Sequence, residues 1–283
     1  MPLRAFYEDE LTYLRDLGGE FAHANPKLAA FLGREAFDPD VERLLEGFSF
    51  LVARLRQRLD DELPALSREF EQSGPASALR WAIEAFGSGV ALATGFGAEG
   101  CVLVDMIARI DPTARIFYLD TDLLFPETYE LRQRLTDRYG VRFEDRAGLS
   151  LTEQAKHYGE NLWERDPDRC CQLRKVVPLR ETLQNLRAWI TAIRRDQSPS
   201  RAQARIVERD VKFGLIKINP LANWSSRQVW QYLFRHDVPY NPLHDRGFPS
   251  IGCVPCTTSV NLGEDARTGR WRGIPKTECG LHS

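Results

Sequence analysis

The chain has 283 residues, of which 43% are hydrophobic and 28% are charged, and its formal net charge at pH 7 is −2. This composition suits one large or two smaller folded domains, and the balanced charge argues against a protein that binds nucleic acid or a membrane surface as a whole. No apolar run approaches the roughly 18 residues of a membrane-spanning helix, and acidic residues at positions 8–10 argue against a signal peptide. Six cysteines are too few for a disulfide scaffold. We therefore expect a cytoplasmic protein.

Residues 1–67 have the pattern of a separate helical segment. One amphipathic stretch covers residues 7–25, and Asp38 with Pro39 has the character of a helix start. The stretch that follows repeats apolar residues at spacings of three and four. No chemically reactive cluster is present, so we predict a helical packing or docking module, joined to the rest by a polar linker at residues 68–77.

From residue 78 to the end, predicted helices and strands alternate. The expected strands cover residues 90–94, 115–119, 141–144 and 189–193, and the expected helices cover residues 78–86, 101–110, 126–139 and 225–236. This alternation predicts an α/β domain with a parallel sheet covered by helices on both faces. Its ligand is expected at the carboxyl ends of the strands.

A glycine-rich loop follows the first predicted strand. Residues 95–100 read Gly-Phe-Gly-Ala-Glu-Gly and match the pattern GxGxxG, with Asp120 about twenty residues further on. Alone, this would favour a nicotinamide-dependent oxidoreductase, but the chain lacks a second nucleotide-binding half. The interpretation that remains is a phosphate-binding turn at a helix N-terminus. A tight turn that needs glycine for backbone reasons is the structural alternative.

Two cysteine pairs, Cys170–Cys171 and Cys253–Cys256, come from distant parts of the chain. Neighbouring Cα atoms lie about 3.8 Å apart, too close for an unstrained disulfide, and zinc sites usually separate paired ligands by about two to four residues. A [4Fe–4S] cluster offers a separate iron to each thiolate. We therefore favour one [4Fe–4S] cluster held by all four cysteines over a zinc site, with unligated core thiols last.

Basic residues accompany these motifs. Residues 166–168, Asp-Pro-Asp, predict a helix start, and Lys175 lies four residues after Cys171 on the same helical face. Two groups of arginines stand out later in the chain, the first with Arg194, Arg195 and Arg201 and the second with Arg267, Arg270 and Arg272. Arginines at the carboxyl end of a strand can bind phosphate or sulfate in a bidentate manner, whereas a solvated charge run is the structural alternative.

Six segments together resemble one family. They are ALATGFGAEGCVLVDM, FYLDTDLLFPETY, CCQLRKVVPL, IRRDQSPSR, SIGCVPCTT and KTECGLH. From about residue 70 to the end, the chain resembles the assimilatory adenylyl-sulfate reductases of the sulfonucleotide reductase family. The resemblance implies an adenine-nucleotide hydrolase-like fold and reduction of adenylyl sulfate to sulfite and AMP, with thioredoxin or glutaredoxin as electron donor. It implies one [4Fe–4S] cluster and neither flavin nor nicotinamide. Thr94, Gly100 and Asp122 depart from residues common in relatives.

The resemblance also implies residue roles. Cys279 would attack the sulfur of the sulfate group and become S-sulfonated, with His282 and Lys175 as further catalytic residues that contribute positive charge. A thiol of thioredoxin would then attack Cys279, which requires a mobile tail. The implied substrate-binding residues are Thr94, Gly95, Gly97, Glu99, Asp120, Thr121, Arg194, Arg195, Arg201, Arg267 and Arg270. Cys101 is expected to be a buried apolar residue.

The N-terminal segment resembles a different protein. FYEDELTYLRDLGGEFAHANPKLAAFLG and DPDVERLLEGFSFLVARLRQRLDDELPAL are similar to the N-terminus of TssF, the large wedge subunit of the type VI secretion baseplate. The chain therefore has the organisation of a fusion, whether natural, engineered or a product of gene prediction. The alternatives to adenylyl-sulfate reduction are a phosphoadenylyl-sulfate reductase, a baseplate interaction protein with baseplate partners, and a nicotinamide-dependent oxidoreductase. The oligomeric state, a homo-oligomer included, stays open.

Overall fold

The computed structural model describes residues 61–261 and 263–282. The chain divides into two compact units, Met1–Leu63 and Pro64–Ser283, of which the second contains the α/β domain. Both helices expected before residue 60 lie outside the described residues.

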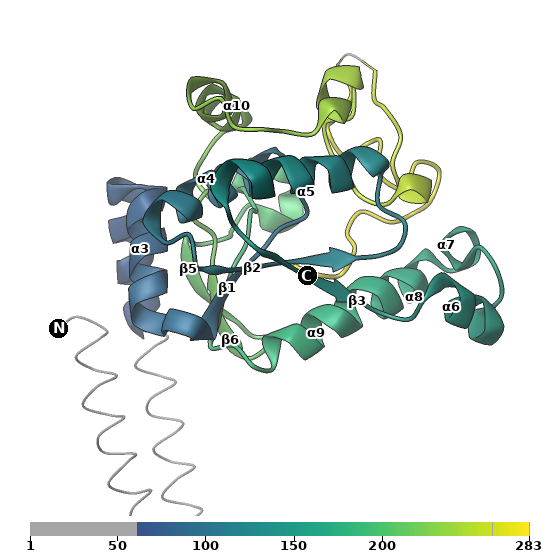
Figure 1. Ribbon diagram of the computed structural model, residues 1–283, viewed down its shortest axis with the longest axis horizontal. Helices are drawn as coiled ribbons and strands as arrows, with labels where there is room; N and C mark the ends of the chain where they lie inside the picture. Colours follow the sequence, from purple (N-terminus) through teal and green to yellow (C-terminus); the bar gives the residue numbers. More distant parts are fainter. Residues whose placement is uncertain (1–60, 262, 283) are drawn as a thin grey trace, which may run out of the picture. The chain divides into compact units, whose positions relative to one another are not determined.

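A six-stranded sheet forms the centre of the second unit, with strand order β3-β2-β1-β4-β6-β5 (Figure 1). The strands are β1 (Val90–Ala93), β2 (Arg115–Asp120), β3 (Phe143–Ala147), β4 (Ala188–Ile190), β5 (Val207–Asp210) and β6 (Leu215–Ile218). Neighbouring strands are parallel except β5, which is antiparallel to β6. The predicted parallel α/β sheet is therefore confirmed, with an antiparallel strand at one edge.

Helices cover both faces of this sheet. They are α3 (Pro75–Phe86), α4 (Ala98–Ile110), α5 (Pro126–Tyr139), α6 (Leu151–Tyr158), α7 (Leu162–Arg165), α8 (Pro167–Cys171), α9 (Val177–Leu183) and α10 (Ser226–Arg235). Figure 1 shows α4 and α5 on one side of the sheet and α9 on the other. The predicted start of α5 at Pro126 is confirmed, and Ser225 caps α10 by accepting a hydrogen bond from the backbone N–H of Gln228.

The central strands are short apolar runs because both of their faces are buried. Leu92 of β1 lies opposite Ile116 of β2, and neither side chain is exposed. Trp189 of β4 belongs to one hydrophobic cluster with Leu179 and Leu183 of α9. Strands covered on both sides read as continuous hydrophobic sequence rather than as an alternating pattern, and this is why the sequence marks them clearly.

The stretch at residues 68–77, predicted to be a linker, is mostly helical. Residues 61–73 form a helix, and α3 begins directly after Gly74, whose φ is +86°. Ser67 on the first of these helices is buried, and its hydroxyl accepts a hydrogen bond from the backbone N–H of Ile206 at 2.8 Å. The polar sequence therefore corresponds to a helix that packs on the α/β unit by one face.

Several element limits also differ from the prediction. The helix α4 begins at Ala98 instead of Cys101, β3 covers Phe143–Ala147 instead of residues 141–144, and β4 ends at Ile190. Residues 191–193, which were expected to continue β4, have irregular backbone. Leaving the sheet early allows this segment to turn over the carboxyl end of β4.

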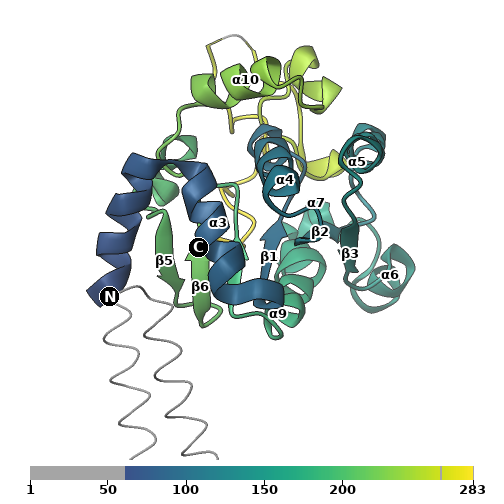
Figure 2. The same ribbon diagram turned by 60° about the vertical axis from the view of Figure 1, so that its left-hand side comes forward.

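The segment after α10 has little regular structure and lies above α4 with α10 (Figure 2). Backbone hydrogen bonds fix its cysteine loop. The N–H of Val254 donates to the carbonyl of Leu123 at 2.7 Å, and the N–H of Trp271 donates to the carbonyl of Cys256 at 3.1 Å. The loop of Cys253 and Cys256 is therefore held beside the connection between β2 and α5.

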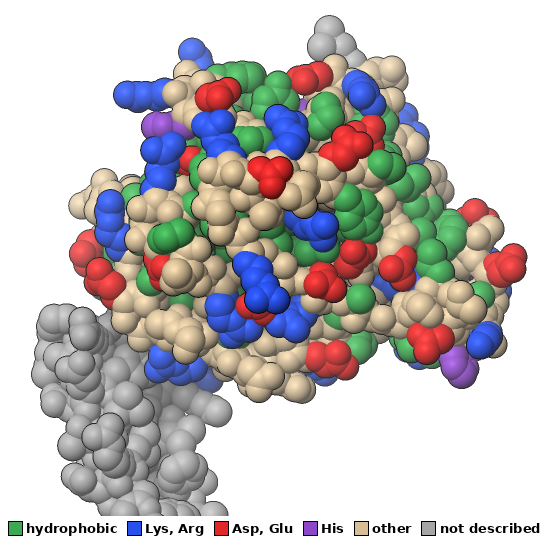
Figure 3. All heavy atoms as spheres, viewed as in Figure 1, with side chains coloured by type: hydrophobic (Ala, Val, Ile, Leu, Met, Phe, Trp, Pro, Cys, Tyr) green, Lys and Arg blue, Asp and Glu red, His purple; other side chains and the backbone are tan. Residues whose placement is uncertain are grey.

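The surface carries both signs of charge. On the face shown in Figure 3, acidic and basic side chains are interspersed. Within the described ranges, no helix combines the length and apolar character needed to cross a membrane.

Candidate active site

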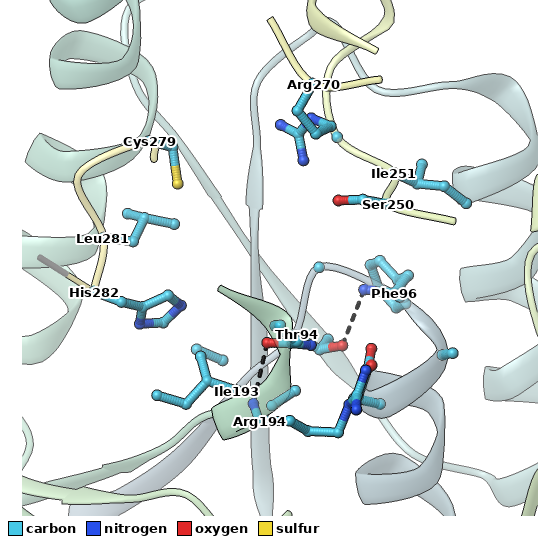
Figure 4. A pocket seen from close by; sticks show the side chains of 18 of the residues that line it. Thr94, Phe96, Ile193, Arg194, Ser250, Ile251, Arg270, Cys279, Leu281 and His282 are labelled. Atoms are coloured by element: carbon cyan, nitrogen blue, oxygen red, sulfur yellow. Dashed lines mark hydrogen bonds and ion pairs between the residues drawn. The ribbon is translucent and has the colours of Figure 1, made fainter. Parts of the chain in front are cut away.

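A cavity of about 390 Å³ lies at the carboxyl ends of β1 and β4. The strand order reverses between these neighbours, because β2 and β3 continue to one side and β6 and β5 to the other. Ligands of open α/β sheets bind in the crevice at such a point. Figure 4 shows Cys279, Leu281 and His282 on one wall, Ser250, Ile251 and Arg270 on the opposite wall, and Thr94, Phe96, Ile193 and Arg194 at the base.

The loop after β1 turns tightly into α4. The buried Thr94 hydroxyl accepts a hydrogen bond from the backbone N–H of Phe96 at 3.1 Å, and Phe96 has a left-handed φ of +58°. A Cβ atom at Gly100 would lie 2.6 Å from the Thr94 hydroxyl oxygen, so glycine is needed for this close approach. Ala98 and Glu99 in the first turn of α4 line the cavity, and first-turn N–H groups have no partner within a helix.

Most of the predicted substrate-binding residues line the cavity, but two do not. Those that line it are Thr94, Gly95, Gly97, Glu99, Thr121, Arg194, Arg201, Arg267 and Arg270. Asp120 instead accepts a hydrogen bond from the Tyr129 hydroxyl at 2.8 Å. Arg195 donates to the carbonyl of Ala204 at 2.7 Å and pairs with Glu71. Arg194 has extended backbone and its side chain lines the cavity, whereas Arg195 begins a 3₁₀-helix and does not line it.

Arg194 is buried and already paired with acidic residues. Its Nε donates to Glu99 at 2.8 Å, and its Nη1 contacts Asp196. The pair with Glu99 joins the segment after β4 to the first turn of α4. The ion pairs of Arg194 therefore stabilise the base of the cavity. Contact between Arg194 and the substrate stays a prediction.

The two cysteine pairs come together beside the cavity. No disulfide joins any of the six cysteines, all of which lie in the described residues. Cys170, Cys171 and Cys253 are buried, and Cys256 is half-buried. Burial, with repulsion from the neighbouring thiolates, raises the pKa of Cys170 to about 12. Burial would also raise the pKa of Cys253, but Lys175, the Thr121 hydroxyl and Arg270 lower it overall. The thiol of Cys253 lies 3.3 Å from the Thr121 hydroxyl oxygen.

The four cysteines of these two pairs were expected to hold one metal cluster. Among the described residues, no group of three or more Cys, His, Asp or Glu side chains forms a site for a single ion. The charges of Cys171, Cys253 and Cys256 all act on Cys170 and contribute to its raised pKa. The four thiols stay a predicted ligand set for a cluster that offers a separate iron to each thiolate.

Lys175 lies between the cysteines and the cavity. It follows Cys171 within a π-helical segment, Gln172–Val176, a local geometry common at functional sites. Burial alone would lower the pKa of Lys175, but the thiolates of Cys253 and Cys279 raise it overall. The lysine therefore stays protonated and can form ion pairs both with the cysteine thiolates and with an anion in the cavity.

The C-terminal tail forms one wall of the cavity. Cys279 and Leu281 line it, and Leu281 packs on the hydrophobic cluster that contains Trp189. The imidazole of His282 stacks on Trp189, with ring centroids 5.6 Å apart and an interplanar angle of 16°. Glu278, directly before Cys279, pairs with an arginine, Arg201, at 2.9 Å.

His282 does not supply the positive charge expected of it. Burial, followed by the positive charges of Lys217, Arg201, Arg267 and Lys212, lowers its pKa well below the usual value. The imidazole is therefore neutral at neutral pH. The expected catalytic role of His282 stays a prediction, but burial and the cations around the tail disfavour a positive charge on it.

Comparison with known proteins gives the family. The family profile described as phosphoadenosine phosphosulfate reductase domain matches residues 89–259, which contain the loop after β1 and both cysteine pairs. The chain belongs to this reductase family. It is 54% identical over 223 residues to the adenosine 5'-phosphosulfate reductase of Salinibacter ruber, covering 78% of this chain and 88% of the relative. It is 48% identical over 211 residues to adenosine 5'-phosphosulfate reductase 1 of Bacillus subtilis, covering 74% and 91%.

A solved structure of the family has the same fold. The phosphate complex of phosphoadenylyl-sulfate reductase from Candida auris has a TM-score of 0.63 and 31% identity, and covers 71% of this chain and 97% of that one. A second family profile, type VI secretion system TssF, matches residues 2–71, in front of the reductase domain. Both resemblances seen in the sequence are therefore confirmed as similarities.

Sequence reasoning missed three side chains of the reductase site. Arg174 is buried and binds the carbonyl of Thr121 at 2.7 Å, which fixes the end of β2. His244 lines the cavity, and neither of its buried ring nitrogens has a hydrogen-bond partner among the described residues. Glu278 anchors the tail. Only Glu278 had a sequence signal, its place directly before the predicted nucleophile.

Proposed function

We propose that this reductase domain reduces adenylyl sulfate to sulfite and AMP in cytoplasmic sulfate assimilation, with thioredoxin or glutaredoxin as electron donor. The observation that carries the proposal is the presence of Cys279 and Lys175 in one cavity with the anion-binding type of loop after β1. The names of relatives at 48% and 54% identity support adenylyl sulfate as the substrate.

The proposed reaction has two displacement steps at sulfur. The thiolate of Cys279 attacks the sulfur of the sulfate group, the bond from that sulfur to the bridging oxygen breaks, and AMP leaves with the electron pair. A thiolate of reduced thioredoxin then attacks the sulfur of Cys279, and sulfite leaves. The second thioredoxin thiol resolves the mixed disulfide, so thioredoxin supplies both electrons and Cys279 is regenerated as a thiol.

Lys175 and Arg270 are proposed to stabilise charge during the first step. Both line the cavity, and Lys175 stays protonated because the neighbouring thiolates raise its pKa. Positioned cations of this kind stabilise negative charge on the leaving group and on the transferred oxygens. Neutral His282 is assigned to stacking on Trp189 and to holding the tail in the cavity.

We assign Cys170, Cys171, Cys253 and Cys256 to one [4Fe–4S] cluster with an electrostatic and structural role. When bound, such a cluster adds fixed charge beside Lys175 and ties α8 to the loop after α10. Anaerobically purified protein is expected to contain about four irons and matching acid-labile sulfide per chain. Stoichiometric zinc without sulfide would contradict this assignment.

The other functions suggested by the sequence are weighed against these observations. A nicotinamide-dependent oxidoreductase is not retained, because the glycine loop lies within the segment matched by the reductase family. Baseplate binding through residues 2–71 rests on the TssF similarity alone. Phosphoadenylyl sulfate is the competing substrate, supported by the weaker similarity to the Candida auris enzyme.

One assay tests the activity and the substrate together. Purified protein with reduced thioredoxin should release sulfite from adenylyl sulfate with a much higher kcat/KM than from phosphoadenylyl sulfate. Without thioredoxin, adenylyl sulfate should add one sulfonate mass to the peptide that contains Cys279. Preference for the phosphorylated nucleotide would reassign the substrate, and a lack of sulfonate with either nucleotide would contradict the proposed reaction.

A further inference from the structure

Glu278 binds side chains from two other segments of the chain. Its carboxylate accepts hydrogen bonds from Nη2 of Arg201 at 2.9 Å and lies 3.2 Å from Nη2 of Arg267. The hydroxyls of Ser198 and Ser200 also donate to it, at 3.3 and 3.4 Å. Only 13% of the Glu278 side chain is exposed. Charge-assisted hydrogen bonds at such a shielded site are among the stronger polar contacts in proteins.

The partners of Glu278 are themselves fixed. Arg201 donates a second hydrogen bond to Gln197 at 2.6 Å, and its side chain is 11% exposed. Arg267 donates to the carbonyl of Thr277 at 2.7 Å, directly before Glu278. The two arginines therefore line the cavity and also hold the tail immediately before the nucleophile.

The contacts on the other side of Cys279 are of a different kind. Lys212 donates to the carbonyl of Gly280, Leu281 packs on the hydrophobic cluster, and His282 stacks on Trp189. Cys279 thus lies between a charged anchor and an apolar anchor. Because the proposed reaction requires the same thiol to meet the substrate and then a protein partner, these anchors must hold the tail and later release it.

We propose that Glu278 is a positioning residue that acts as a latch: its ion pairs with Arg201 and Arg267 hold Cys279 in the cavity, and their rupture frees the tail for the thioredoxin-type partner. The latch rests on the proposed function for its role in turnover, but its effect on the tail is independent of activity. Removing the latch is expected to slow sulfonation by substrate without slowing the release of sulfite from protein already sulfonated.

The test compares Glu278→Ala and Glu278→Gln with wild type and with Glu264→Ala. Glu264 provides a matched control, because it pairs with Arg272 at 2.9 Å on an exposed part of the same C-terminal segment. The rate at which iodoacetamide alkylates Cys279, followed by mass spectrometry of its peptide, reports how often the tail leaves the cavity. Losing charged hydrogen bonds should raise this rate about tenfold or more in Glu278→Ala.

Glu278→Gln keeps a hydrogen-bonding side chain of the same length, so it should raise the alkylation rate less than alanine does. Glu264→Ala should match wild type. An equal rate in the Glu278 and Glu264 variants, at unchanged melting temperature, would overturn the latch. Single-turnover sulfonation should be slower in both Glu278 variants, and unchanged sulfonation in Glu278→Ala would also overturn it. If alkylation rises as expected but wild type itself forms no sulfonate, the proposed reaction fails while the latch stands.

Discussion

Two sides of the cavity are built in different ways. The strand-end wall, which is the base of the cavity in Figure 4, consists of the loop after β1 and the segment after β4, and is held by sheet pairing and by the pair of Arg194 with Glu99 at 2.8 Å. The tail wall consists of residues 278–282, which belong to no helix or strand and are held by side chains. One wall is part of the folded core, and the other is attached to it.

This difference separates two tasks of the site. Binding a nucleotide benefits from backbone groups that do not move, because preorganised groups lose little entropy when the ligand arrives. Carrying a group from one partner to another benefits from a thiol on a segment that can detach. Mutations in the strand-end wall should therefore affect stability and substrate binding, whereas mutations in the tail wall should affect chemistry and leave the fold intact.

The largest expected effect is on chemistry alone. Replacing Cys279 with serine should abolish sulfite release, because a hydroxyl is far less acidic than a thiol and cannot form the S-sulfonate at neutral pH. Nucleotide binding by calorimetry and the melting temperature should stay near wild type, since the tail wall contributes little to the core. Measurable turnover by the serine variant, or a sulfonate mapped to Cys101, would move the nucleophile elsewhere.

A smaller effect, on stability, is expected at the strand-end wall. Gly100→Ala introduces a Cβ 2.6 Å from the Thr94 hydroxyl oxygen, and such overpacking should lower the free energy of unfolding by about 1–3 kcal/mol. Gly95→Ala is the matched control for stability, because a Cβ there would meet no atom within 4 Å.

A double-mutant cycle assigns this effect to a single contact. Thr94→Ala removes the crowded hydroxyl, so Gly100→Ala should cost much less in a Thr94→Ala background when measured by urea denaturation. Additive losses would mean that Gly100 is needed for another reason, and the strand-end wall would then be less tightly packed than its geometry indicates.

The same difference explains what the sequence could predict. Parallel strands buried on both faces produce apolar runs, so β1, β2 and the alternating helices are visible in the sequence, and the conspicuous cysteine spacings are local. Residues 68–77 were predicted to be a linker because their sequence is polar, whereas contacts with partners far away in sequence, such as the pair of Glu71 with Arg195, are not visible in it. The sequence does not distinguish the roles of Arg194 and Arg195, because the backbone conformation decides which of the two side chains lines the cavity.

The tail was the hardest part to predict, because its contacts depend on partners from several segments. Nothing local shows that Arg201 and Arg267 meet at Glu278, or that burial and four cations lower the pKa of His282. The resemblance to the family located Cys279, but the electrostatics of the docked tail required coordinates.

The smallest expected effect is a pH dependence of tail docking. The docked tail lowers the pKa of His282, whereas a detached imidazole titrates at about 6.5. The docked state therefore binds fewer protons than the detached state, so docking is favoured above about pH 6.5. Below this pH, the equilibrium constant for docking falls by at most about tenfold per pH unit.

His282→Phe keeps an aromatic ring to stack on Trp189 and removes the titration. Alkylation of Cys279 should be measured from pH 8 to pH 5.5 in both proteins, because their ratio cancels the change in thiolate fraction. We expect the ratio of wild type to His282→Phe to rise as the pH falls, and a constant ratio would show that His282 does not couple protonation to the tail wall.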